Sequence, residues 1–354
     1  MLKLNWRRMP VKIAGQMVFA IGGPGLCAER WGAEGIIWYI QILCISRYIA
    51  SELTSRIADR STRFSINTHR NSPLFLTIGG LLLIYRPDSD FTLLLLPVVI
   101  GFYVAGYWTS YFDIQDIKGE RTQDYQTTEV VSTVIAAVLV IGVSYYYTVE
   151  LGVVLGGFIA ILTCFFGVGV SPEELSDSLA RWKIKARARN SNETQNGQWI
   201  VRSVAAINFC NISSLRLEIF TEPGSILAEI ITLGSILAFA ELILLFLAIS
   251  VPYNNSKLRE TGFLVTILGF CLMALGGPWL PMAGYILVSS VSRSINRPAD
   301  REYARPALRG IQRPGHREVT RYQMMAILLP LIWIPSILPF VGIIAGVMLF
   351  RCDM

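Results

Sequence analysis

A series of apolar runs, each about as long as a membrane-spanning helix, constrains this chain more than any other feature. The hydrocarbon core of a bilayer is about 30 Å thick, and an α-helix crosses it with roughly 20 residues. Charged residues make up only 16% of the 354 residues and are almost absent from these runs. The runs are apolar on every side, which excludes the amphipathic helices of a soluble core. They cover 11–28, 33–53, 73–86, 91–111, 129–147, 149–169, 224–250, 261–292 and 322–350.

The runs predict an all-α, polytopic integral membrane bundle with about nine or ten transmembrane helices. Four segments leave the number of spans open. Run 73–86 is short, and 203–222 mixes apolar residues with polar ones, so it is either an interfacial helix or a polar span. Run 261–292 contains Gly276, Gly277 and Pro278 and is one broken helix or two short ones. Run 322–350 contains Pro330, Pro335 and Pro339 and could form a tight pair of helices.

A polar, turn-rich stretch at 188–198 divides the chain near its middle. It suggests a first transmembrane half at 1–170, a basic linker at 171–202 and a second transmembrane half at 203–354. The net charge of +6 lies in loops. It is explained by basic loops on one side of a membrane, without nucleic-acid binding. The expected partner is therefore the lipid bilayer, and nothing in the sequence identifies protein partners.

The charges of the loops alternate along the chain. The N-terminus and the loops 54–72, 170–202 and 293–321 are basic, whereas 87–90 reads Pro-Asp-Ser-Asp. By the positive-inside rule we expect the N-terminus and the basic loops on the cytoplasmic side. Loop 293–321 is also cytoplasmic if 203–222 stays on the membrane surface and 261–292 crosses the membrane once.

One acidic segment could carry chemistry where 91–111 meets the cytoplasm. Asp113, Asp116 and Glu120 follow at i, i+3 and i+7, a spacing that puts three carboxylates on one face of a helix. Like charges so placed repel, and a bound Mg²⁺ would remove that repulsion. The alternative is a solvated loop that caps the next helix.

The string Asp113-Ile-Gln-Asp-Ile-Lys-Gly-Glu-Arg resembles the second aspartate-rich motif of the UbiA-type intramembrane prenyltransferase and terpene cyclase superfamily. Asn296-Arg-Pro-Ala-Asp-Arg-Glu resembles that family's first motif, although here the two motifs come in the reverse order. The resemblance implies an enzyme of isoprenoid biosynthesis that binds a prenyl diphosphate through Mg²⁺ and transfers or cyclises the prenyl chain.

The same resemblance implies a set of site residues. The catalytic residues would be Asp113, Asp116 and Asp300. The metal ligands would be Asp113, Asp116, Glu120, Asn296, Asp300 and Glu302. The diphosphate would be bound by Arg121, Arg305, Arg313 and Arg317, because guanidinium groups pair well with phosphate oxygens.

A second, weaker resemblance implies a transporter of a small solute. Ser55-Arg-Ile-Ala-Asp-Arg-Ser-Thr-Arg resembles the loop between the second and third helices of the major facilitator superfamily. There Asp59, Arg60 and Arg63 would latch the two halves on the inside. Charged residues inside the runs are functional candidates under either interpretation, or they pair between helices. These are Arg47, Glu52, Glu229 and Glu241. A structural subunit of a membrane complex is the third interpretation.

Overall fold

The computed structural model describes residues 4, 6, 9–58, 67–68, 71–85, 89–118, 122–166, 193–220, 226–250, 256–277, 279–292 and 316–353. Every regular element within these residues is a helix. The chain divides into two compact units. One unit holds residues 1–181 and 219–238, and the other holds 182–218 and 239–354.

The first unit begins with a helical hairpin. Helix α1 (Met9–Gly15), the π-helical segment η1 (Gln16–Gly22) and α2 (Gly23–Ala58) run on without a gap. The apolar stretch Met9–Thr54 has 46 residues, about 70 Å if it were straight and therefore more than twice a bilayer core. Gly32 has φ 61° and ψ −145°, a conformation that needs glycine, and it divides the stretch into two helices.

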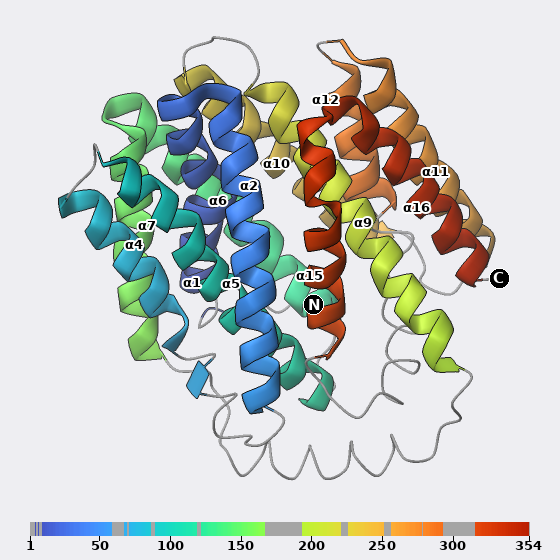
Figure 1. Ribbon diagram of the computed structural model, residues 1–354, viewed down its shortest axis with the longest axis horizontal. Coiled ribbons are helices and arrows are strands. Elements are labelled where there is room, and N and C mark those ends of the chain that lie inside the picture. The colour runs from blue at the N-terminus through green and yellow to red at the C-terminus, as the bar shows by residue number, and fades with distance from the viewer. Residues whose placement is uncertain are drawn as a thin grey trace. The chain divides into compact units, whose positions relative to one another are not determined.

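Residues 226–238, the first part of a later helix, belong to this bundle. Four more helices complete it, coloured from light blue to green in Figure 1. They are α4 (Pro73–Tyr85), α5 (Asp90–Lys118), α6 (Thr122–Tyr146) and α7 (Val149–Phe166). Helix α2 packs along α5, α4 packs against α5 and α7, and α1 packs against α6 and α7. A Cβ on Gly80 would lie 3.3 Å from the Cα of Gly157, so glycine on both helices lets α4 and α7 approach closely.

The described residues of the second unit also form helices. It contains α9 (Glu193–Ile219), most of it within 182–218, and the later part of α10 (Ile226–Ser250). Then come α11 (Ser256–Leu275), α12 (Leu280–Ile286) and the π-helical segment η2 (Leu287–Ser292). The chain ends with α15 (His316–Leu328), the 3₁₀ segments η3 (Leu329–Trp333) and η4 (Pro335–Ile337), and α16 (Leu338–Asp353). Helix α11 packs against α12, η2 and α16.

Glycine and proline break two of the long apolar runs. Gly276 and Gly277 have φ of 67° and 89°, and they separate α11 from α12. Run 322–350 is divided into α15 and α16 by η3 and η4, each of which has proline at its start. The short run 73–86 is helical, and 203–222 belongs mostly to a helix of 27 residues.

The expected all-α membrane bundle is confirmed. When adjoining elements are joined and the hairpin is divided at Gly32, the described residues form twelve helical segments, six before 167 and six after 192. Met9–Thr54, Thr127–Tyr146 and Ile226–Leu247 are long and apolar enough to cross a membrane. Large apolar side chains are also exposed on many helices, for example Phe246, Leu264 and Ile344. A protein in water rarely exposes so much apolar surface, whereas the lipid-facing surface of a membrane protein is apolar. The exposure therefore fits an integral membrane protein.

Candidate functional site

The acidic residues expected to bind Mg²⁺ fall at the edge of the described chain or beyond it. Asp113 and Asp116 belong to the last turns of α5, which ends at Lys118, and their side chains are not among those described. Glu120 lies outside the described residues. The remaining expected ligands, Asn296, Asp300 and Glu302, also lie outside them. Within the described part of the chain, no group of three or more His, Cys, Asp or Glu could hold a metal ion.

The arginines expected to bind a diphosphate also lie at the edge of the described residues or outside them. Arg317 is the second residue of α15, and its side chain is not described. Arg121, Arg305 and Arg313 lie outside the described residues. The roles assigned to these arginines and acids, and the Mg²⁺ cofactor, therefore stay predictions.

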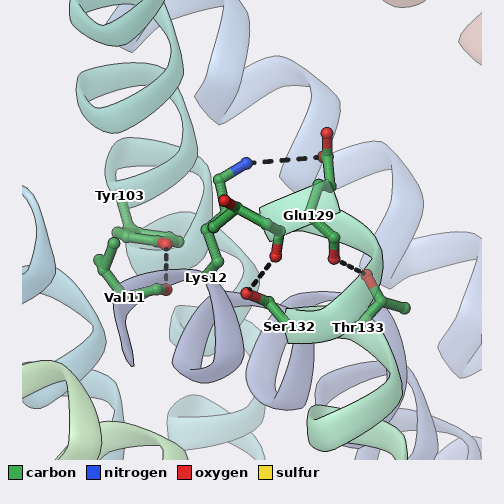
Figure 2. Close-up of polar contacts among 7 residues, drawn as sticks. Val11, Lys12, Tyr103, Glu129, Ser132 and Thr133 are labelled. Carbon is green, nitrogen blue, oxygen red and sulfur yellow. Dashed lines mark hydrogen bonds and ion pairs between the residues drawn. The ribbon is translucent and has the colours of Figure 1, made fainter. Parts of the chain in front are cut away.

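A buried ion pair joins α1 to α6 in the first unit (Figure 2). The Nζ of Lys12 lies 3.8 Å from the Oε1 of Glu129, and the two side chains are only 3% and 11% exposed. Burying such a pair is costly, and removing one partner leaves the other charge uncompensated, at a cost of roughly 3–5 kcal/mol. Charged groups in membrane helices are functional candidates for this reason.

Hydroxyl groups near the pair are bonded within α6. Ser132 donates to the carbonyl oxygen of Thr128 at 2.6 Å, and Thr133 donates to that of Glu129 at 3.0 Å. These i to i−4 bonds satisfy both hydroxyls inside a single helix. Lys12 and Glu129 therefore supply the charge at this place, while the neighbouring hydroxyls stabilise the local structure.

A tyrosine fixes the start of α1 against α5. The hydroxyl of Tyr103 donates to the carbonyl oxygen of Val11 at 2.9 Å, in a buried position beside the ion pair (Figure 2). A Cβ on Gly15 would lie 2.5 Å from that hydroxyl, so only glycine leaves room for it. The π-helical segment η1 begins at the next residue. Such segments are frequent at functional sites.

Arg47, one of the charged residues singled out in the sequence, lies in α2 near an aromatic ring. Its guanidinium carbon is 5.5 Å from the centre of the Phe19 ring. This is a cation–π geometry, and it places a positive charge against the first helix of the same unit. Elsewhere in that unit, Arg30 and Asp90 form an ion pair of 2.8 Å with both side chains about half exposed.

The second unit contains a neutral polar cluster. The Nδ2 of Asn211 in α9 donates to the Oγ of Ser289 in η2 at 2.7 Å. Asn211 is buried, and its Oδ1 has no hydrogen-bond partner among the described residues. The buried Oγ of Ser214 likewise has no partner in that part of the structure. Residues 211 and 214 are one turn apart on the same face of α9.

No protein-family model and no curated protein matches the chain. A solved structure with a similar fold is a mutant form of the nucleoside transporter NupG. The likeness covers 98% of this chain and 99% of that chain, with a TM-score of 0.58 and 12% identical residues. At this identity the likeness shows the fold alone, and the similar structure has the fold of the major facilitator superfamily.

This finding corrects the interpretation of the chain as a prenyltransferase or terpene cyclase of isoprenoid biosynthesis. The fold similarity extends over nearly the whole chain and is to a transporter. The resemblance to the UbiA-type enzymes rested on two short acidic strings in reverse order. The pair at 113 and 116 has the i, i+3 spacing that any helix end can carry, here the end of α5. The weaker resemblance, to the major facilitator superfamily, is the one that the fold supports.

Neither buried cluster was predicted from the sequence. Lys12 lies at the start of run 11–28 and Glu129 at the start of run 129–147, and neither was singled out as a candidate. Asn211 belongs to the ambiguous segment 203–222. A signal was present in each case, because a lysine, a glutamate and an asparagine within a few residues of apolar stretches are costly unless they have partners.

Proposed function

We propose that this chain is a membrane transporter of the major facilitator type that carries a small polar solute. The observation that carries this proposal is the fold similarity to a nucleoside transporter over nearly the full length of both chains. The buried Lys12–Glu129 pair and the buried Asn211–Ser289 pair support it. Polar and charged groups inside membrane helices are costly, so they usually serve a function.

Nucleosides are the first class of solute to test. The similar structure is of a nucleoside transporter, and nucleosides are neutral molecules with several hydroxyl and N–H groups. A site of uncharged polar side chains such as Asn211 and Ser289 suits such groups better than it suits an ion. Sugars share this chemistry and belong in the same panel.

The segment Ser55–Arg63 has the role of a latch in this proposal. Asp59, Arg60 and Arg63 lie outside the described residues, and Ser55 is in the last turn of α2. Their position after the second helical segment agrees with the loop that the segment resembles. Opposite charges in such a loop would stabilise one of the conformations through which a transporter passes.

We also propose that the N-terminus and the basic loops face the cytoplasm. If each of the twelve helical segments crosses the membrane once, loops 59–66, 167–192 and 293–315 fall on the side of the N-terminus, and 86–89 falls on the other. The positive-inside rule then gives the orientation. Compared with the expected spans, 203–222 adds one crossing because it lies mostly in a helix, and 261–292 adds another because it forms two helices. Two added crossings leave loop 293–315 on the side expected from the sequence.

The orientation can be tested with cysteines introduced by Ser89→Cys and Ser191→Cys. In right-side-out vesicles a membrane-impermeant maleimide should label the protein carrying Ser89→Cys and spare the one carrying Ser191→Cys. The unmodified protein, whose Cys271 is exposed, supplies the background. The reverse labelling would contradict the orientation.

Transport itself is tested with purified protein in liposomes. The panel consists of radiolabelled uridine, adenosine and glucose as neutral solutes, lactate and uridine monophosphate as anions, and choline as a cation. The proposal predicts saturable uptake of a neutral solute above that of protein-free liposomes. A protein that is folded in the liposomes and takes up none of the panel would contradict it.

A further inference from the structure

The side-chain amide of Asn211 is only half satisfied. Its nitrogen donates to Ser289 at 2.7 Å, but its oxygen is buried with no hydrogen-bond partner in the described structure. The residue is only 3% exposed. A buried carbonyl oxygen without a donor costs about 1–3 kcal/mol, and most proteins avoid it. Such an oxygen marks a place where a donor from elsewhere would be stabilising.

Ser214 adds a second group of the same kind on the same face of α9. Its hydroxyl oxygen is also buried without a partner among the described residues. Two other buried hydroxyls of this unit are satisfied by their own helix. Thr266 donates to the carbonyl oxygen of Gly262 at 2.9 Å, and Ser290 donates to that of Ile286. The hydroxyl of Ser214 differs from these two, which already have acceptors in their own helices.

The partner of Asn211 lies in an unusual helix. Ser289 belongs to the π-helical segment η2, which continues α12. π-Helical turns are rare and often accompany functional sites, because the wider turn displaces side chains and carbonyl groups from α-helical positions. The Asn211–Ser289 hydrogen bond therefore links one of the two unsatisfied groups to this irregular backbone.

We propose that Asn211 and Ser214 form a hydrogen-bonding subsite for an uncharged polar group of the transported solute. This inference rests on the proposed transport function and names the solute chemistry. The Oδ1 of Asn211 accepts a hydrogen bond from a solute O–H or N–H group, and the hydroxyl of Ser214 donates to or accepts from a neighbouring solute atom. The hydrogen bond to Ser289 holds the amide so that its oxygen is the free end.

The charges along α9 disfavour an anion at this subsite. Glu218 lies a further turn along the face that carries residues 211 and 214, and it is exposed. Arg216, which is buried, lies about 200° around the helix from Ser214. A carboxylate and a carbonyl oxygen on one face repel negative groups. Hydroxyl, amide and ring N–H groups therefore fit best.

The test compares Ser214→Ala with Ser290→Ala in purified, liposome-reconstituted protein. The substrate is the neutral solute of the transport panel that the parent protein carries best. We expect Ser214→Ala to raise the half-saturation concentration about five- to tenfold, the loss of one hydrogen bond to the solute. Its melting temperature should stay equal or rise, because the change removes an unsatisfied buried hydroxyl. Ser290→Ala, which removes a hydroxyl bonded within its own helix, should leave the half-saturation concentration unchanged.

A second variant guards against a chance result. Asn211→Leu keeps the size of the side chain and removes the acceptor. It should therefore raise the half-saturation concentration for the same solute at least as much as Ser214→Ala does. The subsite is overturned if both variants fold and keep the parent's half-saturation concentration, or if the parent carries only charged solutes. Equal competition by uridine monophosphate and uridine would also overturn it. In these cases transport itself stands, whereas a parent protein that carries nothing overturns the proposed function together with the subsite.

Discussion

The ammonium group of Lys12 lies 3.8 Å from the carboxylate of Glu129, and this pair joins the start of α1 to α6 inside the first unit. Both side chains are almost fully buried. Lys12 is next to Val11, whose carbonyl oxygen accepts the hydrogen bond from Tyr103. The first turn of α1 is thus bound to α6 by charge and to α5 by a hydrogen bond.

Removing one charge of this pair should destabilise the protein more than removing both. We expect Lys12→Met or Glu129→Gln alone to lower the free energy of unfolding by roughly 3 kcal/mol, because each leaves a buried charge without its counter-charge. The double variant should recover part of this loss. Melting temperatures in detergent micelles check the prediction. The matched control is Asp90→Asn, which breaks the half-exposed Arg30–Asp90 pair and should cost about 0.5 kcal/mol or less. Equal losses at Asp90 and Glu129 would contradict the account.

The contact of Tyr103 with α1 should depend on Gly15 more than on the hydroxyl group. Tyr103→Phe removes one buried hydrogen bond and should cost about 1 kcal/mol. Gly15→Ala should cost more, because its Cβ would lie 2.5 Å from the Tyr103 hydroxyl and force α1 and α5 apart. Thermal unfolding of the two variants ranks these losses. A Gly15→Ala protein as stable as the parent would show that the helices do not meet as described.

Glycines in α11 and α12 should be essential for packing in the second unit. A Cβ on Gly284 would overlap the carbonyl oxygen of Gly269, a backbone atom that cannot turn away. We expect Gly284→Ala to lower the fraction of protein that stays monodisperse after heating, measured by size-exclusion chromatography. Gly142→Ala is the matched control, because a Cβ there meets nothing within 4 Å. In an otherwise helical position it should be neutral or stabilising by up to about 1 kcal/mol. Similar behaviour of the two variants would contradict the α11–α12 contact.

The segment Ser55–Arg63 should matter for transport and little for folding. If Asp59 latches one conformation of a transporter, Asp59→Asn should lower the rate of uptake roughly tenfold, which corresponds to about 1.4 kcal/mol of lost preference. The yield of folded protein should not change. Asp90→Asn, the same substitution in an exposed ion pair, should retain the parent's rate. An unchanged rate in the Asp59→Asn protein would rule out the latch.

Much of the fold follows from hydropathy, but the number of helices does not. The apolar runs predicted the class of protein because length and apolarity are what a bilayer demands. The ambiguous segments depended on local backbone geometry. Hydropathy averages over Gly276 and Gly277, whose positive φ values separate α11 from α12, and over the prolines that begin η3 and η4.

The candidate site was less predictable from the sequence, because it depends on which helices meet. Lys12 and Glu129 are 117 positions apart along the chain, and Asn211 and Ser289 are 78 apart. Nothing in a single sequence pairs them. The short motif near Asp113, by contrast, attracted a chemical interpretation from local spacing alone. Spacing within one helix end is weak evidence for a metal site, and the fold similarity is to a transporter.

Solute counterflow tests the central claim most directly. Liposomes containing the purified protein are loaded with unlabelled uridine, adenosine or glucose and diluted into a trace of the same labelled solute. A carrier that exposes its site alternately to the two sides predicts a transient accumulation of label above equilibrium, absent from protein-free liposomes. Label that only equilibrates, or does not enter at all for any of the three solutes, would contradict the account of this chain as a major-facilitator-type transporter of a neutral polar solute.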